Sequence, residues 1–289
     1  VVGGATTYMR IYFIGVIFVL IYNIGSGILR AIGDSRRPLY VLIFCCLCNV
    51  VLDILFVKAF RMGVAGAAVA TVITEAVSSL VLLVILLRSR DSYRLILRKI
   101  RLDLPLLGDI LRIGFPAGLQ SVMYAVSNVF IQTNINAFGT DVVAGWTAYG
   151  KIDSLFWMVM DAFGISITTF TGQNIGARKL DRVRQGIRTC SLMAFGFSFA
   201  LSGLLFVFGD QIVRLFNNDA GVVAAAGEMM RCAYPYFFTY VLICVLGGAM
   251  RGAGDSLKPM LMVAGGICLF RIVWIAVAHS LGAYVTAMI

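Results

Sequence analysis

Three oxygen-bearing side chains, Asn49, Asp53 and Thr71, have the chemistry and spacing of a small-cation site. Asn49 and Asp53 are four residues apart, so a helix presents both on one face. Thr71 belongs to the next apolar segment, which runs back and places its hydroxyl at a depth similar to that of Asn49. A carboxylate, an amide oxygen and a hydroxyl are hard oxygen ligands, suited to sodium or to a proton relay. Spacing alone leaves a second interpretation equally open, in which Asp53 pairs with Lys58 or Arg61 at the outer mouth.

A second acid, Glu75, lies on a polar stripe with Thr71, Thr74 and Ser78. Their spacing puts the stripe on one helix face, and ionisable residues inside a membrane face the protein interior rather than lipid. Glu75 is therefore a candidate for the substrate path or for titration. The alternative, which such residues more often represent, is a glutamate that bonds to neighbouring helices for packing.

A further polar stripe in a later apolar segment contains Ser121, Tyr124, Asn128 and Gln132, and Gln120 lies beside it. Amide and phenol groups at this spacing suit substrate binding, and ordinary hydrogen bonding between helices explains them equally well. The stretch 172–179 lacks the Gly-Lys-Ser/Thr of a phosphate-binding loop, so no nucleotide site is visible. No zinc motif and no nucleophile–base constellation appears, and the chain has a single histidine. The sequence therefore predicts neither ATP-driven transport nor an enzyme, and no cofactor.

The elements that must carry these side chains are membrane spans. The chain is 60% hydrophobic and 13% charged, with a mean hydropathy of +0.93, which is too apolar for a soluble domain of 289 residues. Several nearly uncharged segments reach the length of about 18 residues needed to cross a hydrocarbon core of about 30 Å. The sequence predicts an all-α polytopic membrane protein. We expect eight complete spans, at about 8–30, 38–58, 64–87, 113–137, 142–168, 186–208, 230–250 and 259–279.

The basic residues predict the orientation of these spans. Most of the 24 Lys and Arg residues lie in four connections, those around 31–37, 88–112, 169–188 and 251–258. The positive-inside rule makes this side cytoplasmic. The net charge of +10 thus indicates membrane orientation rather than nucleic-acid binding.

One hairpin sequence occurs twice, as Arg30-Ala-Ile-Gly-Asp-Ser-Arg-Arg-Pro38 and as Arg251-Gly-Ala-Gly-Asp-Ser-Leu-Lys-Pro259. Related hairpins in an apolar chain indicate two pseudo-symmetric helical lobes, as in many transporters. Gly, Asp, Ser and Pro are the residues of a tight turn and a helix start. We interpret the following residues as structural hinges: Gly33, Asp34, Pro38, Gly254, Asp255 and Pro259.

The basic stretch 88–101 spaces apolar residues among charges, as an amphipathic helix on the inner membrane surface would. We predict a first lobe over 1–90, a cytoplasmic basic linker helix over 91–112 and a second lobe over 113–289, which ends with the start of a further span.

The Gly-Asp-Ser hairpins, Gly114-Phe-Pro116 and Gly172-Gln-Asn-Ile-Gly-Ala-Arg-Lys179 together resemble the multidrug and toxic compound extrusion (MATE) transporters. Members of that family have twelve spans in two six-span lobes. The resemblance implies that this chain is a fragment carrying about spans four to eleven, with an incomplete first lobe.

The resemblance also implies a function. Members export amphipathic, often cationic, organic compounds in exchange for sodium or protons, by alternating access of two lobes. The family's cation site in the first lobe corresponds here to Asp53, Asn49 and Thr71, and the same comparison extends to Asn23 and to Tyr8. Counted in residues from the outer end of its span, Asn23 lies deeper than the other predicted ligands. It could join them only if the helix that carries it is bent.

In the second lobe this chain departs from the family pattern, with Tyr124 and Tyr240 where some members carry acids. The departure argues against a second-lobe cation site, and the two tyrosines instead offer aromatic faces to a cationic substrate. We expect a monomer in the plasma membrane, with small molecules and the bilayer as partners. The alternative within the same superfamily is a lipid-linked saccharide flippase, which would need more cations inside its spans than Lys151 and Arg271.

Overall fold

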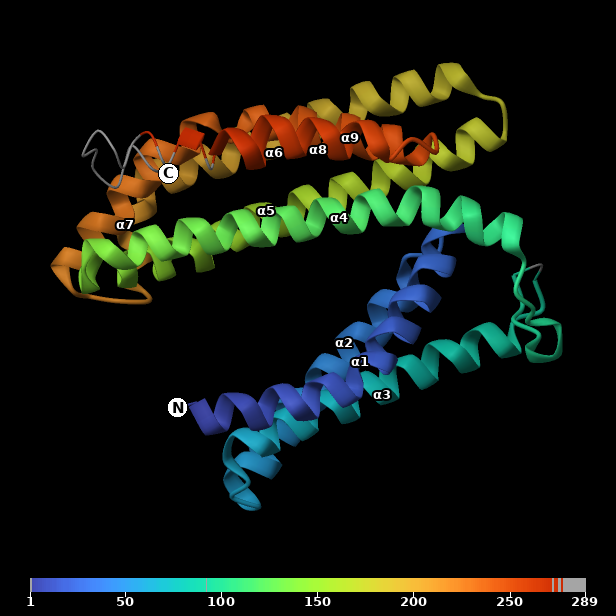
Figure 1. The fold of residues 1–289 in the computed structure, drawn as a ribbon, viewed down its shortest axis with the longest axis horizontal. Helices are drawn as coiled ribbons and strands as arrows, with labels where there is room; N and C mark the ends of the chain where they lie inside the picture. The colour runs from blue at the N-terminus through green and yellow to red at the C-terminus, as the bar shows by residue number, and fades with distance from the viewer. Residues whose placement is uncertain (1, 92, 272, 275–276, 278–289) are drawn as a thin grey trace. The chain divides into compact units, whose positions relative to one another are not determined.

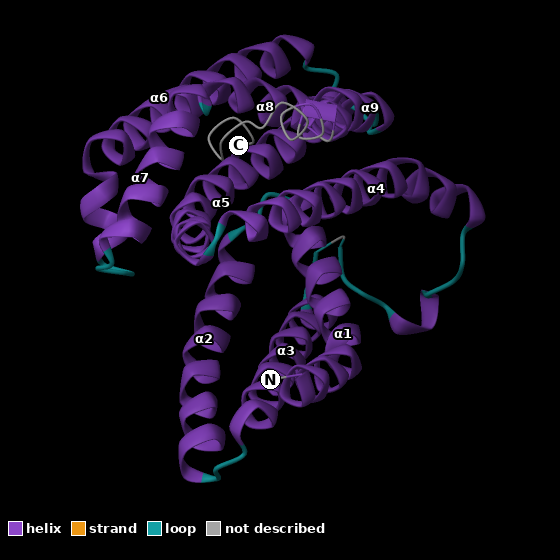
Figure 2. Cartoon of the chain, turned by 60° about the vertical axis from the view of Figure 1, so that its left-hand side comes forward, coloured by secondary structure: helices purple, strands orange, loops and turns teal. Residues whose placement is uncertain are grey.

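The computed structural model describes residues 2–91, 93–271, 273–274 and 277. Throughout this described part the chain forms helices joined by loops, with no strand (Figure 2). Helices cover all eight ranges predicted as spans, the last as far as the description reaches, and the predicted all-α fold class is confirmed. The chain divides into two compact units, Val1–Leu102 and Asp103–Ile289, which are described separately as unit 1 and unit 2.

Unit 1 is built on its third helix (Figure 1). α1 (Val2–Ala31) and α2 (Arg36–Asp53) both pack against α3 (Gly63–Arg88) and touch each other little. α2 continues into a π-helical segment, η1 (Ile54–Ala59), which ends the span. A buried cluster joins all three helices through Leu29, Val41, Cys45, Leu82 and Leu86.

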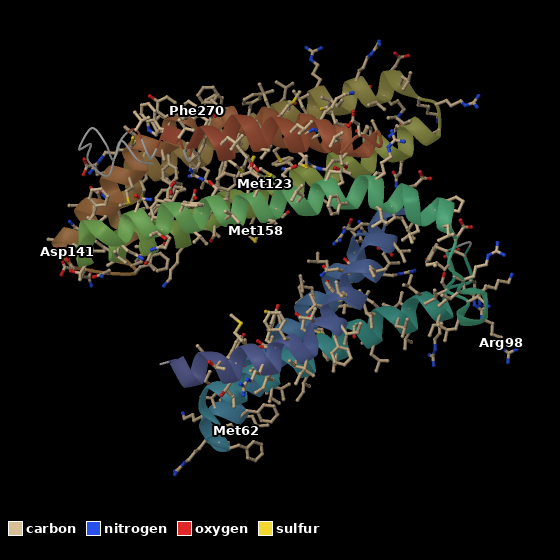
Figure 3. The ribbon with its side chains drawn as sticks, viewed as in Figure 1. Met62, Arg98, Met123, Asp141, Met158 and Phe270 are labelled. Atoms are coloured by element: carbon tan, nitrogen blue, oxygen red, sulfur yellow. The ribbon has the colours of Figure 1, made fainter. Side chains whose placement is uncertain are left out.

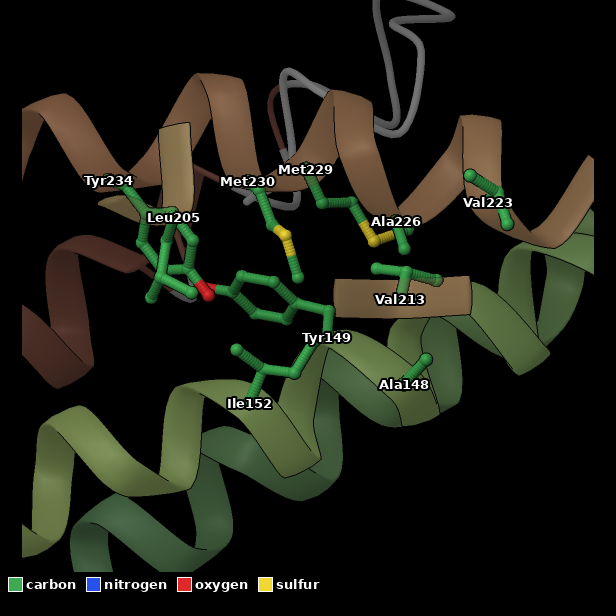
Figure 4. Packing of buried hydrophobic residues seen from close by; sticks show 10 residues of the cluster. All are labelled: Ala148, Tyr149, Ile152, Leu205, Val213, Val223, Ala226, Met229, Met230 and Tyr234. Carbon is green, nitrogen blue, oxygen red and sulfur yellow. The ribbon is translucent and has the colours of Figure 1, made fainter. Parts of the chain in front are cut away.

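Unit 2 is organised around the 37-residue helix α5, which packs against α6, α7 and α8. α4 instead packs against α9 and the π-helical segment η5. The main buried cluster, shown in Figure 4, includes Tyr149, Met230 and Tyr234. The elements are α4 (Leu104–Ile135), η3 (Asn136–Phe138), α5 (Thr140–Gly176), α6 (Leu180–Arg214), α7 (Ala220–Ala233), η4 (Tyr234–Tyr236), α8 (Phe238–Gly252), α9 (Leu257–Val263) and η5 (Ala264–Leu269).

The length and apolarity of each helix decide whether it could cross a membrane. Within the described residues, α1, α2 with η1, α3, α5 and α6 are each long and apolar enough to cross a membrane. The α7–η4 segment and α8 together meet the same criteria, but the chain bends by 54° between them. Pro235 lies in η4 at this bend, where its missing N–H interrupts the helical hydrogen bonds. α4 is long enough at 32 residues but less apolar, and the described helix after the second hairpin, Leu257–Leu269, is shorter.

Both copies of the repeated hairpin form the same turn. In the first, the N–H of Gly33 donates to the carbonyl of Arg30 (2.9 Å) and that of Asp34 to Leu29 (2.9 Å). In the second, Gly254 donates to Arg251 and Asp255 to Met250, each at 3.0 Å. These bonds form a Schellman motif, whose C′ residue needs a positive φ. The φ angles of the two glycines are +91° and +89°, which explains glycine at both positions.

The aspartate of each hairpin, rather than the serine, caps the following helix. Asp34 Oδ1 accepts from the backbone N–H groups of Arg36 and Arg37, both at 3.1 Å. Asp255 Oδ1 accepts from the N–H of Lys258 at 3.2 Å, and the Lys258 ammonium lies 2.7 Å from Oδ2. Pro38 and Pro259 lie in the first turns of α2 and α9.

The predicted linker helix over 91–112 is wrong as a single element. The connection after α3 contains only a 3₁₀ turn, η2 (Leu97–Lys99), and α4 begins at Leu104. Asp103 caps α4 by accepting from Leu106 N–H at 3.2 Å, and Pro105 occupies its first turn. Because a helix starts at this cap, the basic residues before it form a loop instead. In unit 1 this loop, marked by Arg98 in Figure 3, lies at the opposite end of α3 from Met62.

Candidate functional site

A half-open cavity of about 310 Å³ lies in unit 1, between α1, α2 and α3. It contains most of the polar side chains that the sequence pointed to in this part of the chain. Its walls are partly apolar, and the polar groups converge from all three helices, which is typical of small-ligand sites. The lining residues are Val19, Tyr22, Asn23, Leu42, Cys45, Cys46, Asn49, Thr71, Thr74, Glu75 and Ser78.

Contacts between the helices set how deep each group lies. On α1, Gly15 lies against Val72 and Gly25 against Leu82, so α1 and α3 run parallel with one constant register. Asn49 of α2 donates its amide N–H to the Thr74 hydroxyl at 3.4 Å, which fixes the antiparallel register of α2 and α3. From Thr71 to Ser78 the cavity therefore extends by about 10 Å along α3, at 1.5 Å per residue.

Asn49 and Thr71 lie at one end of the cavity, where their side-chain oxygens could ligate a cation. The Thr71 hydroxyl donates to the carbonyl of Ala67 (3.0 Å), and so its oxygen lone pairs stay available. Asn49 uses its amide N–H on Thr74, and among the described residues no donor bonds its amide oxygen. Both oxygens can therefore ligate a cation that enters the cavity.

Glu75 and Asn23 belong to the other part of the cavity. The helix register places Asn23 close to the level of Leu80, about nine residues deeper than Thr71. Asn23 thus lines the same cavity without a bend in α1, but it does not lie level with Thr71 in one ligand shell. The Glu75 carboxylate is half-buried, and within the described part of the chain it has no ion pair and no side-chain hydrogen bond. It is the acid that the cavity exposes to a ligand.

The structure does not bring Asp53 into this cavity, contrary to the predicted convergence with Asn49 and Thr71. Counting four residues outward from the Asn49–Thr74 contact brings Asp53 level with Ala70, which has no polar side chain to offer. Asp53 ends α2, and its Oδ1 is buried without a hydrogen-bond partner.

The alternative pairing of Asp53 at the outer mouth is also not formed. Within the described residues, no ion pair within 4.0 Å joins Asp53 to Lys58 or Arg61. Tyr8 is likewise outside the cavity lining; its ring stacks on Tyr12, with 6.2 Å between centroids.

In unit 2 the predicted polar stripe is partly used in contacts between helices. Asn128 accepts a long hydrogen bond from Arg271 (3.5 Å). Tyr124 of α4 and Tyr240 of α8 lie next to each other, with their phenol groups close together. Gln120 is half-buried beside this group on α4, without a described side-chain bond. The structure thus brings the side chains of Tyr124 and Tyr240 near each other.

Sequence reasoning missed a half-buried acid of unit 2, Asp153. Its Oδ2 accepts from the indole N–H of Trp157 at 2.5 Å, and its Oδ1 is buried without a partner. Tyr149 stacks on Tyr234 beside it, and Tyr240 meets Trp157 edge-on with 4.5 Å between centroids. The signal was present, because Tyr149, Asp153 and Trp157 are spaced by four and share one helix face.

Several relatives indicate which family has this architecture. The Bacillus subtilis protein described as probable multidrug resistance protein YpnP is 32% identical over 259 residues, covering 89% of this chain and 58% of the relative. The protein described as probable multidrug resistance protein YoeA, also from Bacillus subtilis, is 28% identical over 266 residues, covering 90% of this chain and 58% of the relative. The chain thus spans less than two thirds of the length of either relative.

Solved structures show the same fold. One is described as the outward-facing conformation of a multidrug resistance MATE family transporter of the MOP superfamily. It matches with a TM-score of 0.89 at 24% sequence identity, covering 97% of this chain and 63% of that chain. The sequence profile of the MatE family matches residues 1–55 and 116–277, which include the first hairpin, most of the unit 1 cavity and the second hairpin. The chain is a multi-pass membrane protein and belongs to the MatE family.

Proposed function

We propose that the protein is a secondary active antiporter, which exports amphipathic or cationic organic compounds in exchange for sodium or protons by alternating access of two lobes. The observation that carries this proposal is the unit 1 cavity, in which oxygen ligands and one acid converge from three apolar helices. Ionisable residues inside membrane segments are costly, which makes them candidates for ion and substrate pathways and for proton relays. Membership of the MatE family supports the same function.

The coupling ion binds at the Asn49 and Thr71 end of the cavity. There an amide oxygen and a hydroxyl oxygen are available, and the buried Asp53 Oδ1 lies one turn farther along α2 with no partner. A sodium ion needs further oxygen ligands, and a proton needs only the carboxylate. A small shift of the α2–η1 junction would turn Asp53 toward these ligands, because a π-helical turn is a site of local adjustment.

A cationic substrate group binds deeper, beside Glu75 and Asn23. A cavity of about 310 Å³ is at the lower end of the size of small-molecule sites. The unpaired Glu75 carboxylate attracts a positive charge, and the Tyr22 ring lines the same wall. Tyr124 and Tyr240 supply a second aromatic contact in unit 2.

The flippase alternative is less well supported. A lipid-linked pyrophosphate needs several converging cations, whereas Lys151 lies over the Phe216 ring at 5.8 Å and Arg271 donates to Asn128. We further propose that the protein works as a monomer in the plasma membrane, with both Gly-Asp-Ser hairpins and residues 88–112 on the cytoplasmic side. Transport uses no ATP.

Asp53→Asn tests the role of the acid in coupling. In the full-length protein this change keeps the shape of the side chain and removes its charge, so gradient-driven dye efflux should be abolished while membrane insertion is retained. Asp109→Asn, which changes an exposed acid near the start of α4, is the matched control and should transport normally. Normal efflux by Asp53→Asn would contradict the proposed role of Asp53.

A further inference from the structure

A shallow basic pocket lies on the loop that follows α3, within unit 1. It has a volume of about 290 Å³. Two cationic side chains share this concavity with aliphatic and aromatic ones, so a single ligand could meet positive charge and apolar surface together. The lining residues are Tyr93, Arg94, Leu95, Ile96, Lys99 and Ile100.

The two cations of the pocket are not neutralised by protein groups. Within the described residues, neither Arg94 nor Lys99 has an acid within 4.0 Å. The nearby Asp91 carboxylate instead accepts from the Ser89 hydroxyl at 3.4 Å. Both cations are therefore available to an anionic ligand.

The apolar residues around the pocket are unusually exposed. Ile96 is 43% exposed, Leu97 57% and Ile100 65%. Aliphatic side chains next to a cluster of cations are poorly placed in water alone, but they suit the boundary between lipid headgroups and acyl chains.

Hydrogen bonds hold the loop in this shape. Leu95 N–H donates to the Leu86 carbonyl at the end of α3 (3.1 Å), and Lys99 N–H donates to Ile96 (2.9 Å). The Tyr93 hydroxyl accepts from the Arg37 guanidinium (3.0 Å), which ties the pocket to the first hairpin. These bonds fix the backbone of the loop and the position of Tyr93, and so they keep the residues that line the pocket together.

We propose that this pocket binds the headgroup of an anionic phospholipid. Its phosphate lies between Arg94 and Lys99, and the start of an acyl chain lies on Ile96 and Ile100. Basic residues at the end of a membrane span attract anionic lipids at the membrane surface. The proposal concerns lipid binding alone and stands whether or not the cavity of unit 1 binds a coupling ion.

Lipid binding can be measured on the delipidated full-length protein by native mass spectrometry. Phosphatidylglycerol is titrated against phosphatidylcholine as the zwitterionic reference. The double variant Arg94→Gln/Lys99→Gln should weaken phosphatidylglycerol binding by about 30-fold, because each basic side chain near a membrane surface contributes roughly a factor of five. Phosphatidylcholine binding should change little.

The matched control is Arg90→Gln/Arg98→Gln. It removes the same charge from the same loop, but neither residue lines the pocket, and Arg98 projects away from the ribbon (Figure 3). This control should keep most of the phosphatidylglycerol affinity. An equal loss in the two double variants would show diffuse charge attraction and would overturn the proposal.

Two further experiments distinguish a phospholipid from a free anion as the ligand of the pocket. Ile96→Asn/Ile100→Asn leaves the cations in place and should also weaken phosphatidylglycerol binding, because the acyl chain loses its apolar contact. Inorganic phosphate should fail to displace the lipid. Displacement by phosphate at matched concentration, or full binding by the Ile96→Asn/Ile100→Asn variant, would contradict a phospholipid site.

Discussion

The two acids that the sequence singled out in unit 1 have different surroundings, and this difference separates their proposed roles. Glu75 opens onto a cavity with no side-chain partner, whereas Asp53 ends α2 with one buried, unpaired oxygen outside the cavity lining. A carboxylate that faces a cavity can meet an organic cation directly. A buried carboxylate without a partner is costly to leave charged, and it gains most from a small ion or a proton.

Glu75→Gln should weaken the binding of cationic substrates and leave neutral ones nearly unchanged. Hydrogen bonds to charged groups contribute about 1.5–3 kcal/mol, so the dissociation constant of a cationic dye should rise by about 10- to 150-fold. The measurement is equilibrium dye binding to the purified full-length protein. Glu228→Gln, which changes an exposed acid on α7, is the control and should bind normally. Equal losses for cationic and neutral dyes would point to a packing role instead.

The sequence predicted which residues share a helix face but not how the faces meet. Thr71, Thr74, Glu75 and Ser78 do lie along one wall of the cavity, as their spacing predicted. The predicted convergence of Asp53 with Asn49 and Thr71 was wrong. Asp53 lies at the height of Ala70, and this alignment depends on the register between α2 and α3. That register results from packing contacts between distant segments, and no local pattern in the sequence encodes it.

At the scale of single elements, the repeated hairpin shows how the same residues build the same turn twice. The two Schellman turns have identical hydrogen-bond patterns, and the two glycines have nearly equal φ angles. Turn chemistry is local, and this part of the fold could therefore be predicted from the sequence. The capping group could not be assigned between neighbouring aspartate and serine, and the structure shows that aspartate caps both helices.

The second hairpin should lose stability in acid. The ammonium and the backbone N–H of Lys258 hold the pKa of Asp255 below its ordinary value of about 4. The contribution of this carboxylate is complete above that ordinary value and is lost as the pH falls through the lowered pKa. Asp255→Asn should therefore flatten the acid side of a plot of melting temperature against pH. If the melting temperature of Asp255→Asn fell in acid as steeply as that of the unchanged protein, the Asp255 carboxylate would not be the source of this pH dependence.

The contact between α5 and α8 depends on small residues. The Thr168 hydroxyl lies 2.9 Å from the Gly248 carbonyl, and a Cβ on Gly252 would lie 2.4 Å from the Thr168 carbonyl oxygen. Glycines spaced by four let two membrane helices approach closely.

Gly252→Ala should consequently destabilise unit 2. The clash involves backbone, which cannot move aside easily, and overpacking of this kind costs about 1–3 kcal/mol. Thermal unfolding of the full-length protein in detergent measures the effect. Gly196→Ala is the control, because a Cβ there meets nothing within 4 Å, and it should be neutral or slightly stabilising. Equal melting temperatures for the two variants would show that the α5–α8 contact is looser than described.

At the scale of the whole molecule, composition was sufficient to predict an all-α membrane protein, and the repeated hairpin and family motifs were sufficient to predict its family. Element boundaries were less predictable. Residues 91–112 looked like one amphipathic helix, but the Asp103 cap and Pro105 divide them into a loop and the start of α4. Asp153 could not be singled out from the sequence, because its burial against Trp157 depends on how neighbouring helices pack.

Export by the whole protein is proposed to depend on an ion gradient. The most direct measurement uses the full-length protein in sealed vesicles with a fluorescent cationic dye, under an imposed sodium gradient, an imposed proton gradient or none. A tenfold ion gradient supplies about 1.4 kcal/mol per ion, enough to support about a tenfold dye gradient in a one-for-one neutral exchange. We expect the dye to move against its own concentration gradient only when one of the two ion gradients is present. The dye gradient should collapse when an ionophore dissipates that ion gradient. Equal dye movement with and without ion gradients would show that export is not driven by either ion.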